Sequence, residues 1–318
     1  MEMISQSQLE SGKGGQAISG VILVNNYGIN LTKKGTEYIA GKLQSGISID
    51  FKAWGNSTAF TTMKNEEYSN VPSYISGKFD DFGGSLSIII DTIQAIEGYN
   101  PTDFYPVVYN TEAYYDALKN LFKSKVSDKC MNLANKYLFE NPDVLDRFKI
   151  EFAASSGHDN VKSGLLAHTF KVLSLLSCVQ GMYPKLFNRP DSDKISTQDF
   201  IDLLYFGAMF HDIGKTVEMN YGVYQPESIV THRFLSIEFV DKKDIVDAYD
   251  EYWYYNLVSI FLQHHGDFDD ACRTSAALII HKVDMMDAEF TILSQSIENA
   301  IEKDNMRRVK FNGKFITV

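Results

Sequence analysis

The sequence predicts a chain of two structural classes, a small β-barrel followed by an all-helical bundle. Short alternating strand patterns fill residues 16–98, and helical patterns fill most of the chain after residue 110. All seven histidines lie between His158 and His281. The length of 318 residues also exceeds what one hydrophobic core usually organises, and therefore favours about two domains.

The composition is that of an ordinary soluble protein, with 44% apolar and 22% charged residues. Three well-separated cysteines and the absence of a C-x-x-C pair argue against a disulfide framework or a zinc knuckle, and fit a reduced cytoplasm. Residues 1–15 are polar and rich in Gly and Ser, so we expect a flexible N-terminus with no leader. No apolar run has the length of a membrane span.

The net charge of -11 argues against a protein that coats nucleic acid with a broad basic surface. It does not exclude a nucleic-acid substrate, because a metal-dependent active site needs surplus carboxylates. The segment 241–270 is rich in such residues. The charge therefore discriminates weakly between function classes.

Five runs with β-branched and alternating patterns are predicted to be strands. In residues 47–54, for example, Phe51 shares an apolar face, whereas Lys52 and Trp54 lie on the other face. Turn-forming residues separate the runs, including Asn25-Asn26 after the first. Five short strands in about 80 residues suit a small closed barrel of the OB type. The predicted strands are 18–24, 38–43, 47–54, 73–79 and 86–93.

A segment with two prolines, Pro101 and Pro106, marks the end of the strand pattern. We therefore expect a barrel at 16–98, a connector with helices at 99–140, and the bundle at 141–318. Residues 181–196, with two further prolines, are predicted to be a loop. The expected helices begin at Thr111 and continue over 132–140, 165–179, 197–211, 252–263 and 275–301.

His211 and Asp212 stand side by side at the end of a very apolar helix. A buried Asp is costly there unless it is paired or binds a metal. Together with His168 and Asp284, these residues form a mixed nitrogen and oxygen set that suits Mn²⁺, Mg²⁺, Fe or Co and leaves positions open for water and phosphate. Lys215 follows as a candidate phosphate-binding cation.

His232 and His264 are predicted to hold a second ion nearby, because two metals stabilise both the attacking and leaving oxygens in phosphoryl transfer. Any single histidine on an apolar helix is more often a plain core residue, so the prediction depends on the whole ordered series. His265 is expected to orient or contact substrate, and His281 to lie on a helix surface. Asp287 is expected to be structural or to support a ligand. The remaining carboxylates, Asp267, Asp269 and Asp270, are expected to form a solvated acidic loop.

This series resembles the HD superfamily of metal-dependent phosphohydrolases, named for the doublet present here as His211-Asp212. The phrases at residues 158–169, 211–215, 264–266 and 284–288 are similar to those of the YhaM-type 3′→5′ exoribonuclease family, which also places an OB-fold before its HD domain. The sequence departs from that family at Asp159, at Ser163 and after Gly266. These departures affect the expected substrate channel and leave the ligands intact.

The resemblance implies stepwise hydrolysis of single-stranded RNA, and of single-stranded DNA as a further substrate, from the 3′ end to nucleoside 5′-monophosphates. It implies two divalent ions, with Mn²⁺ favoured. His158 is expected to contact the scissile phosphate or the terminal nucleotide. The residues that we expect to carry the chemistry are Asp212, Lys215, His158 and His265.

Aromatic and basic residues of the barrel are candidates for binding a single strand, because stacking tolerates every base. For each aromatic residue, burial in the small core is the competing interpretation. The candidates are Tyr38, Lys52, Trp54, Phe79 and Phe82, with Lys33, Lys34, Lys42 and Lys78 as further phosphate contacts.

Two other functions fit the same sequence. One is an HD phosphohydrolase of nucleotides or cyclic nucleotides, which would use every predicted ligand. The other is a non-catalytic protein that binds single strands, although buried carboxylates at an abandoned site would be costly to keep. We expect no membrane partner, and aromatic residues near Tyr252 would suit a homo-oligomer interface if they were exposed.

Overall fold

The computed structural model divides into two compact units, residues 1–108 and 109–318. The first unit extends ten residues beyond the predicted barrel, because the short helix η1 (Pro101–Phe104) buries Phe104, whose carbonyl accepts a hydrogen bond from Gly46 N at 2.8 Å. The structure describes residues 1–155, 158–189, 193–225, 228–266, 271–304, 308–311 and 314–317.

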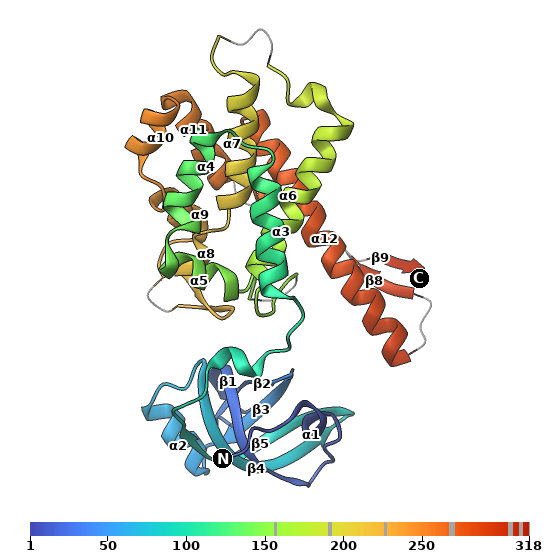
Figure 1. Cartoon of the computed structure of the whole chain (residues 1–318). Helices are drawn as coiled ribbons and strands as arrows, with labels where there is room; N and C mark the ends of the chain where they lie inside the picture. Colours follow the sequence, from blue (N-terminus) through green and yellow to red (C-terminus); the bar gives the residue numbers. More distant parts are fainter. Residues whose placement is uncertain are drawn as a thin grey trace. The chain divides into compact units, whose positions relative to one another are not determined.

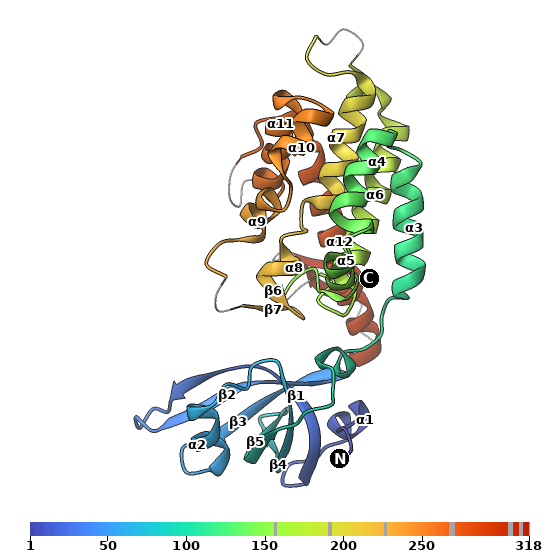
Figure 2. The same cartoon turned by 60° about the vertical axis from the view of Figure 1, so that its left-hand side comes forward.

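The first unit is a closed barrel of five strands in the order β1-β2-β3-β5-β4 (Figures 1 and 2). Strand β4 pairs with β1 and closes the barrel, and β3 pairs with β5 in parallel. This is the topology of an OB-fold. The strands are β1 (Ala17–Leu31), β2 (Glu37–Ser45), β3 (Ile47–Trp54), β4 (Val71–Phe82) and β5 (Ser85–Ala95).

The side chains of β3 alternate between the core and the outer face of the barrel, as predicted. Ile49, Phe51 and Ala53 are buried in the barrel core, whereas Lys52 and Trp54 are half-buried on the outer face. The end of strand β1 differs from the prediction. Strand β1 continues past Asn25-Asn26, because a bulge between Val24 and Asn26 absorbs the irregularity and the chain turns later, at Thr32 to Thr36.

The N-terminal segment is folded, so the expectation of a flexible tail at 1–15 is wrong. Met3 forms a bridge with Val21, and helix α1 (Gln6–Glu10) follows with Ser5 as its N-cap. Ile4 and Leu9 are buried in the barrel core. A helix between the third and fourth strands, α2 (Thr58–Asn65), was also not predicted; it buries Ala59, Phe60 and Met63.

The second unit is a helical bundle in which α7 packs against α6, α11 and α12 (Figure 1). The described part of this unit also contains two small β-hairpins, β6 paired with β7 and β8 paired with β9. The prediction of an all-helical bundle did not include these hairpins. Its elements are α3 (Thr111–Lys123), α4 (Asp128–Ala134), η2 (Asn135–Phe139), α5 (Pro142–Ile150), α6 (Gly164–Met182), η3 (Pro184–Leu186), α7 (Thr197–Phe210), α8 (Lys215–Glu218), β6 (Met219–Asn220), β7 (Val223–Tyr224), α9 (His232–Glu238), α10 (Lys242–Ala248), α11 (Glu251–Gln263), α12 (Ser275–Asp304), β8 (Arg308–Phe311) and β9 (Lys314–Thr317).

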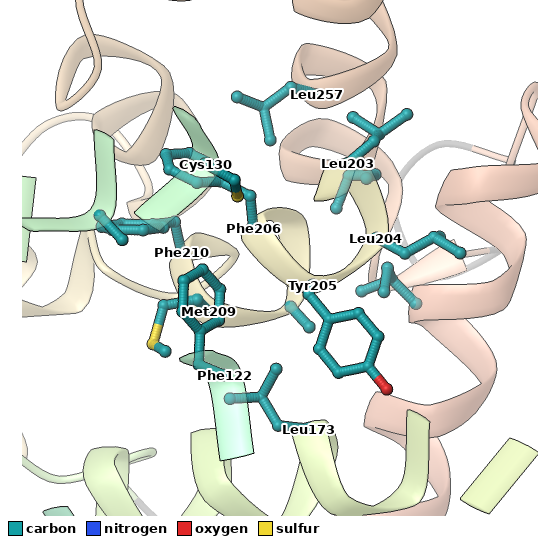
Figure 3. Close-up of a cluster of buried hydrophobic side chains, with 14 of the residues drawn as sticks. Phe122, Cys130, Leu173, Leu203, Leu204, Tyr205, Phe206, Met209, Phe210 and Leu257 are labelled. Carbon is teal, nitrogen blue, oxygen red and sulfur yellow. The ribbon is translucent and has the colours of Figure 1, made fainter. Parts of the chain in front are cut away.

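Helix α7 is the centre of the bundle core (Figure 3). Every residue from Asp202 to Phe210 is buried, which explains why its sequence is apolar on all sides. Phe206 stacks on Phe210 with ring centroids 4.3 Å apart and meets Trp253 edge-on at 5.8 Å. This packing fixes the end of α7, and therefore the His-Asp doublet that follows it.

Helix α6 is the one described helix whose length and composition would suit a membrane span. Its apolar residues instead belong to the bundle core, where Leu165, Leu166, Val172, Leu173 and Leu176 are buried. It also carries a buried histidine, His168. We therefore describe α6 as a core helix.

Candidate metal centre

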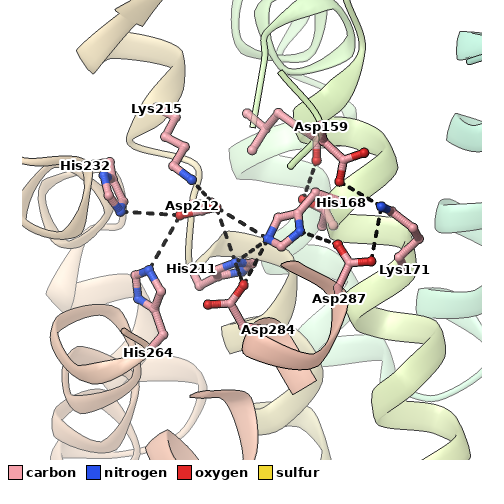
Figure 4. A network of polar contacts seen from close by, with 12 residues as sticks. Asp159, His168, Lys171, His211, Asp212, Lys215, His232, His264, Asp284 and Asp287 are labelled. Atoms are coloured by element: carbon pink, nitrogen blue, oxygen red, sulfur yellow. Dashed lines mark hydrogen bonds and ion pairs between the residues drawn. The ribbon is translucent and has the colours of Figure 1, made fainter. Parts of the chain in front are cut away.

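Three helices bring four predicted ligands to one point of the bundle (Figure 4). His168 comes from α6, His211 and Asp212 from the end of α7, and Asp284 from α12. Nε2 of His168 lies 3.3 Å from Nε2 of His211 and 3.1 Å from Oδ1 of Asp284. Oδ2 of Asp212 lies 3.6 Å from His168 Nε2 and 3.4 Å from His211 Nε2.

These separations fit one bound ion. Ligand atoms about 2.1 Å from a metal are about 3.0 Å apart in octahedral geometry and about 3.4 Å apart in tetrahedral geometry. The separations that join His168 and His211 to each other and to the two carboxylates run from 3.1 Å to 3.8 Å. Mixed imidazole and carboxylate ligands are those that Mn²⁺, Fe and Co accept, with positions left for water and substrate oxygen.

The other oxygen of Asp212 faces a second group of imidazoles. Oδ1 of Asp212 lies 3.4 Å from Nε2 of His232 and 3.5 Å from Nε2 of His264. Among the residues that the structure describes, none of these three buried atoms has a hydrogen-bond partner. Buried polar atoms that face one another unsatisfied mark a missing ion or water. His265 offers a further nitrogen, because its ring belongs to the same metal-sized group.

The other ring nitrogen of each principal histidine is held by the protein. Nδ1 of His211 donates to Ala208 O at 2.9 Å, and Nδ1 of His264 donates to Phe261 O at 3.0 Å. Because a carbonyl can only accept, Nε2 of both rings keeps its lone pair for a metal. His232 and His168 use carboxylates in the same way, Glu218 at 2.9 Å and Asp287 at 2.7 Å.

The doublet reaches both groups because the chain leaves the helix at this point. Helix α7 ends at Phe210, and His211 and Asp212 occupy the turn that leads to α8. Gly214 allows that turn to pass α9 closely, because a Cβ at this position would lie 2.2 Å from the carbonyl oxygen of His232. The glycine therefore serves close packing at this turn.

The electrostatics of the site favour an added positive charge. Burial opposes ionisation of Asp212, yet Lys215 and His211 hold the pKa of its carboxyl well below the usual range. Burial alone would also lower the pKa of His168, but hydrogen bonds to Asp284 and Asp287 outweigh it and raise that pKa to about 10. The ion-free protein thus draws a proton to the place where a metal cation would bind.

Lys215 and His158 border the first group of ligands. Nζ of Lys215 lies 2.6 Å from Oδ2 of Asp212. The ring of His158 lies 5.1 Å from that of His168, and burial lowers the pKa of His158 to about 4, which keeps its imidazole neutral. Both residues are therefore placed to contact a group that binds at the ions.

Two predictions for the neighbouring residues need correction or fall outside the structure. His281 was expected on a helix surface, but it is buried and its Nδ1 donates to the carbonyl of His264 at 2.7 Å. It supports the ligand loop because Gly266 leaves room for its ring. The predicted acidic loop at Asp267, Asp269 and Asp270 lies outside the described residues.

The barrel candidates divide into exposed and buried residues. Tyr38 and Trp54 form a cross-strand pair with ring centroids 5.2 Å apart, and Nζ of Lys52 lies 6.0 Å from the Trp54 ring. Phe82 is 82% exposed at the β4–β5 turn. Phe79 is only 2% exposed, so its prediction as a base contact is wrong; its strand turns that side chain inward, beneath Gly12.

The barrel has a groove of about 470 Å³ whose lining includes Lys52, the residue next to the Trp54 ring. Lys42 and Lys52 contribute to its walls together with Phe82. Lys42 is paired with Asp50 at 2.6 Å. Lys33, Lys34 and Lys78 are exposed outside the groove lining. The groove thus combines an aromatic ring with cationic side chains.

Comparison with known protein families finds a match within the helical unit. Residues 165–289 match the family model described as the HD domain. The helical unit contains an HD domain. The matched range includes the predicted ligands on α6, α7, α9, α11 and α12.

Two curated relatives extend the likeness. The chain is 26% identical over 203 residues to the 3′-5′ exoribonuclease YhaM of Bacillus subtilis (strain 168), covering 57% of this chain and 60% of the relative. It is 28% identical over 178 residues to YhaM of Listeria welshimeri, covering 52% and 53%. The chain therefore matches between about half and three fifths of the length of these relatives.

Solved structures match the barrel region weakly. The mitochondrial single-stranded DNA binding protein Rim1 of S. cerevisiae has a TM-score of 0.24 at 10% identity, covering 27% of this chain and 97% of Rim1. A Replication Protein A heterotrimer bound to single-stranded DNA has a TM-score of 0.24 at 17% identity, covering 31% and 83%. The barrel assignment depends on its own strand order.

Proposed function

We propose that this protein is a metal-dependent exonuclease that hydrolyses single-stranded RNA, and single-stranded DNA as well, from the 3′ end to nucleoside 5′-monophosphates. The observation that carries the proposal is Asp212, whose two oxygens face two separate sets of imidazole nitrogens. The relatives named YhaM are 3′-5′ exoribonucleases, which supports the same activity and end specificity.

His168, His211, Asp212 and Asp284 would hold one ion, and Asp212, His232, His264 and His265 the other. When bound, two divalent ions supply an activated water and offset the charge on the phosphoryl oxygens. Mn²⁺ is our preferred metal because the ligands combine imidazoles with carboxylates.

The other residues at the centre act on the substrate. The ammonium of Lys215, 2.6 Å from the bridging carboxylate, would bind a non-bridging phosphoryl oxygen as negative charge grows there. The neutral ring of His158 would donate a hydrogen bond to the terminal phosphate or nucleotide.

The barrel would hold the strand upstream of the scissile bond. Tyr38 and Trp54 offer ring faces to bases, and the groove places Lys42 and Lys52 for phosphates. Neither contact reads base identity, as an exonuclease without sequence preference requires. The exposed ring of Phe82 would add a further stacking surface at the groove.

The test is incubation of the purified chain with Mn²⁺ and single-stranded RNA labelled at its 5′ end. We expect a ladder that shortens from the 3′ end, with nucleoside 5′-monophosphates as the released product. Internal cuts or release from the 5′ end would contradict the proposal. Absence of RNA cleavage together with hydrolysis of nucleotides or cyclic nucleotides would favour the small-molecule phosphohydrolase. Binding of single strands without Mn²⁺ and without cleavage would favour the non-catalytic protein.

A further inference from the structure

A continuous series of polar contacts leads from the predicted ligand His168 through Asp287 and Lys171 to Asp159 (Figure 4). It continues to Tyr109, the first residue of the helical unit. Nδ1 of His168 donates to Oδ2 of Asp287 at 2.7 Å. Nζ of Lys171 lies 3.1 Å from Oδ1 of Asp287 and 2.7 Å from Oδ2 of Asp159. The hydroxyl of Tyr109 donates to the remaining oxygen of Asp159. We call Tyr109, Asp159, Lys171 and Asp287 the Lys171 network.

Helical spacing places the members of the network on facing surfaces. His168 and Lys171 are three residues apart on α6, and Asp284, Asp287 and Thr291 follow one face of α12. The Lys171 ammonium donates to Oδ2 of Asp159 and, at 2.8 Å, to the hydroxyl oxygen of Thr291. With the Asp287 carboxylate at 3.1 Å, three oxygen atoms surround the ammonium and fix the orientation of the head group.

Burial makes the network costly unless it serves a purpose. Asp159 is fully buried and Asp287 is 4% exposed. Two buried carboxylates share one ammonium, and removal of that ammonium would leave Asp159 without a cation and Asp287 with His168 alone. Asp159 also has a φ of 48°, a left-handed conformation that residues other than glycine adopt rarely and that is concentrated at functional sites.

We propose that Lys171 is a positioning residue for the metal centre. By holding Asp159 and Asp287 together, it fixes the Asp287 carboxylate against Nδ1 of His168 and directs Nε2 of that ring toward the ion. Groups that support a metal ligand in this way typically change metal affinity when they are altered. The inference deepens the proposed function, because it depends on the same metal centre.

The direction of the change in Mn²⁺ affinity on removal of Lys171 distinguishes a positioning role from a purely electrostatic one. Lys171 carries a positive charge close to the site, so by Coulomb repulsion its removal should strengthen the binding of a divalent cation. If Lys171 positions Asp287 and His168, its removal should weaken that binding. A structural role far from the ligands would leave the affinity unchanged.

The experiment titrates the full-length chain with Mn²⁺ in the absence of substrate, using the paramagnetic resonance signal of free Mn²⁺. We expect Lys171→Met to weaken Mn²⁺ binding roughly tenfold or more, and Lys171→Arg to recover part of it. The matched control is Lys149→Met, which removes a lysine paired with Glu112 at 3.0 Å elsewhere in the same unit. Unchanged or tighter Mn²⁺ binding by Lys171→Met would overturn the inference.

Two further measurements keep the outcomes distinct. If Lys171→Met does not fold, as judged by its circular dichroism, Lys171→Gln replaces it, because the amide keeps a polar group at this position and removes both ion pairs; a loss of Mn²⁺ affinity supports the inference, and unchanged or tighter binding overturns it. If the unaltered chain binds no Mn²⁺, the proposed function itself fails. If the unaltered chain binds Mn²⁺ and the variants bind it equally, only the role of the Lys171 network fails.

Discussion

Asp212 is the residue on which the chemistry of this protein depends most. Its two oxygens serve different neighbours, His168 and His211 on one side and His232 and His264 on the other. In the proposed function this carboxylate, buried among imidazoles and held anionic, would bind two cations, one through each oxygen. The other ligands each belong to one side only.

This division predicts separable metal sites. Asp284→Asn should remove one of two bound Mn²⁺ ions, because Asp284 faces only His168 and His211. His264→Gln should remove the other, because its Nε2 faces Oδ1 of Asp212. Metal analysis of the dialysed proteins measures the stoichiometry. Loss of both ions in each variant, or of neither, would contradict two sites that share only Asp212.

The ordered series of histidines and aspartates made most ligands predictable from sequence, because each lies at a fixed place on an apolar helix. The supporting residues were less accessible. Glu218 and Lys171 look like ordinary charged residues in sequence, and only the fold places them against His232 and Asp287. The inward turn of His281 likewise depends on the small volume of Gly266.

Among the elements, long periodic helices and alternating strands followed the prediction, and short elements did not. Helix α2 of eight residues and the two-residue strands β6 and β7 have too few positions for a period to show. Strand β1 extends beyond its predicted end because pairing with β2 overrides the turn preference of Asn25-Asn26. The buried place of Phe79 follows from strand register, which the sequence alone left open.

A substitution on the outer face of β2 and β3 tests whether the barrel binds the strand. Trp54→Ala should lower kcat/KM on long RNA about 5- to 150-fold, since stacking is worth about 1–3 kcal/mol per base. Hydrolysis of a dinucleotide should stay near the unaltered rate. Tyr183→Ala, which removes a 58% exposed aromatic of the helical unit, is the control. Equal losses on both substrates would show that the barrel face does not hold the strand.

At the scale of the whole chain, the two units divide the expected work. Every histidine lies in the helical unit, and the aromatic pair with its groove lies in the barrel. In the proposed function, both units act on one nucleic-acid strand, which the barrel holds and the helical unit hydrolyses. The net charge of -11 is a sum over the whole chain and does not describe the groove, where Lys42 and Lys52 lie.

The most direct test of the central claim replaces Asp212 with alanine and follows both Mn²⁺ content and nucleotide release from single-stranded RNA. We predict that Asp212→Ala retains neither ion and releases no nucleoside 5′-monophosphate, while its circular dichroism remains that of a folded helical protein. An Asp212→Ala protein that still shortens RNA in the presence of Mn²⁺ would contradict the assignment of this centre as the active site.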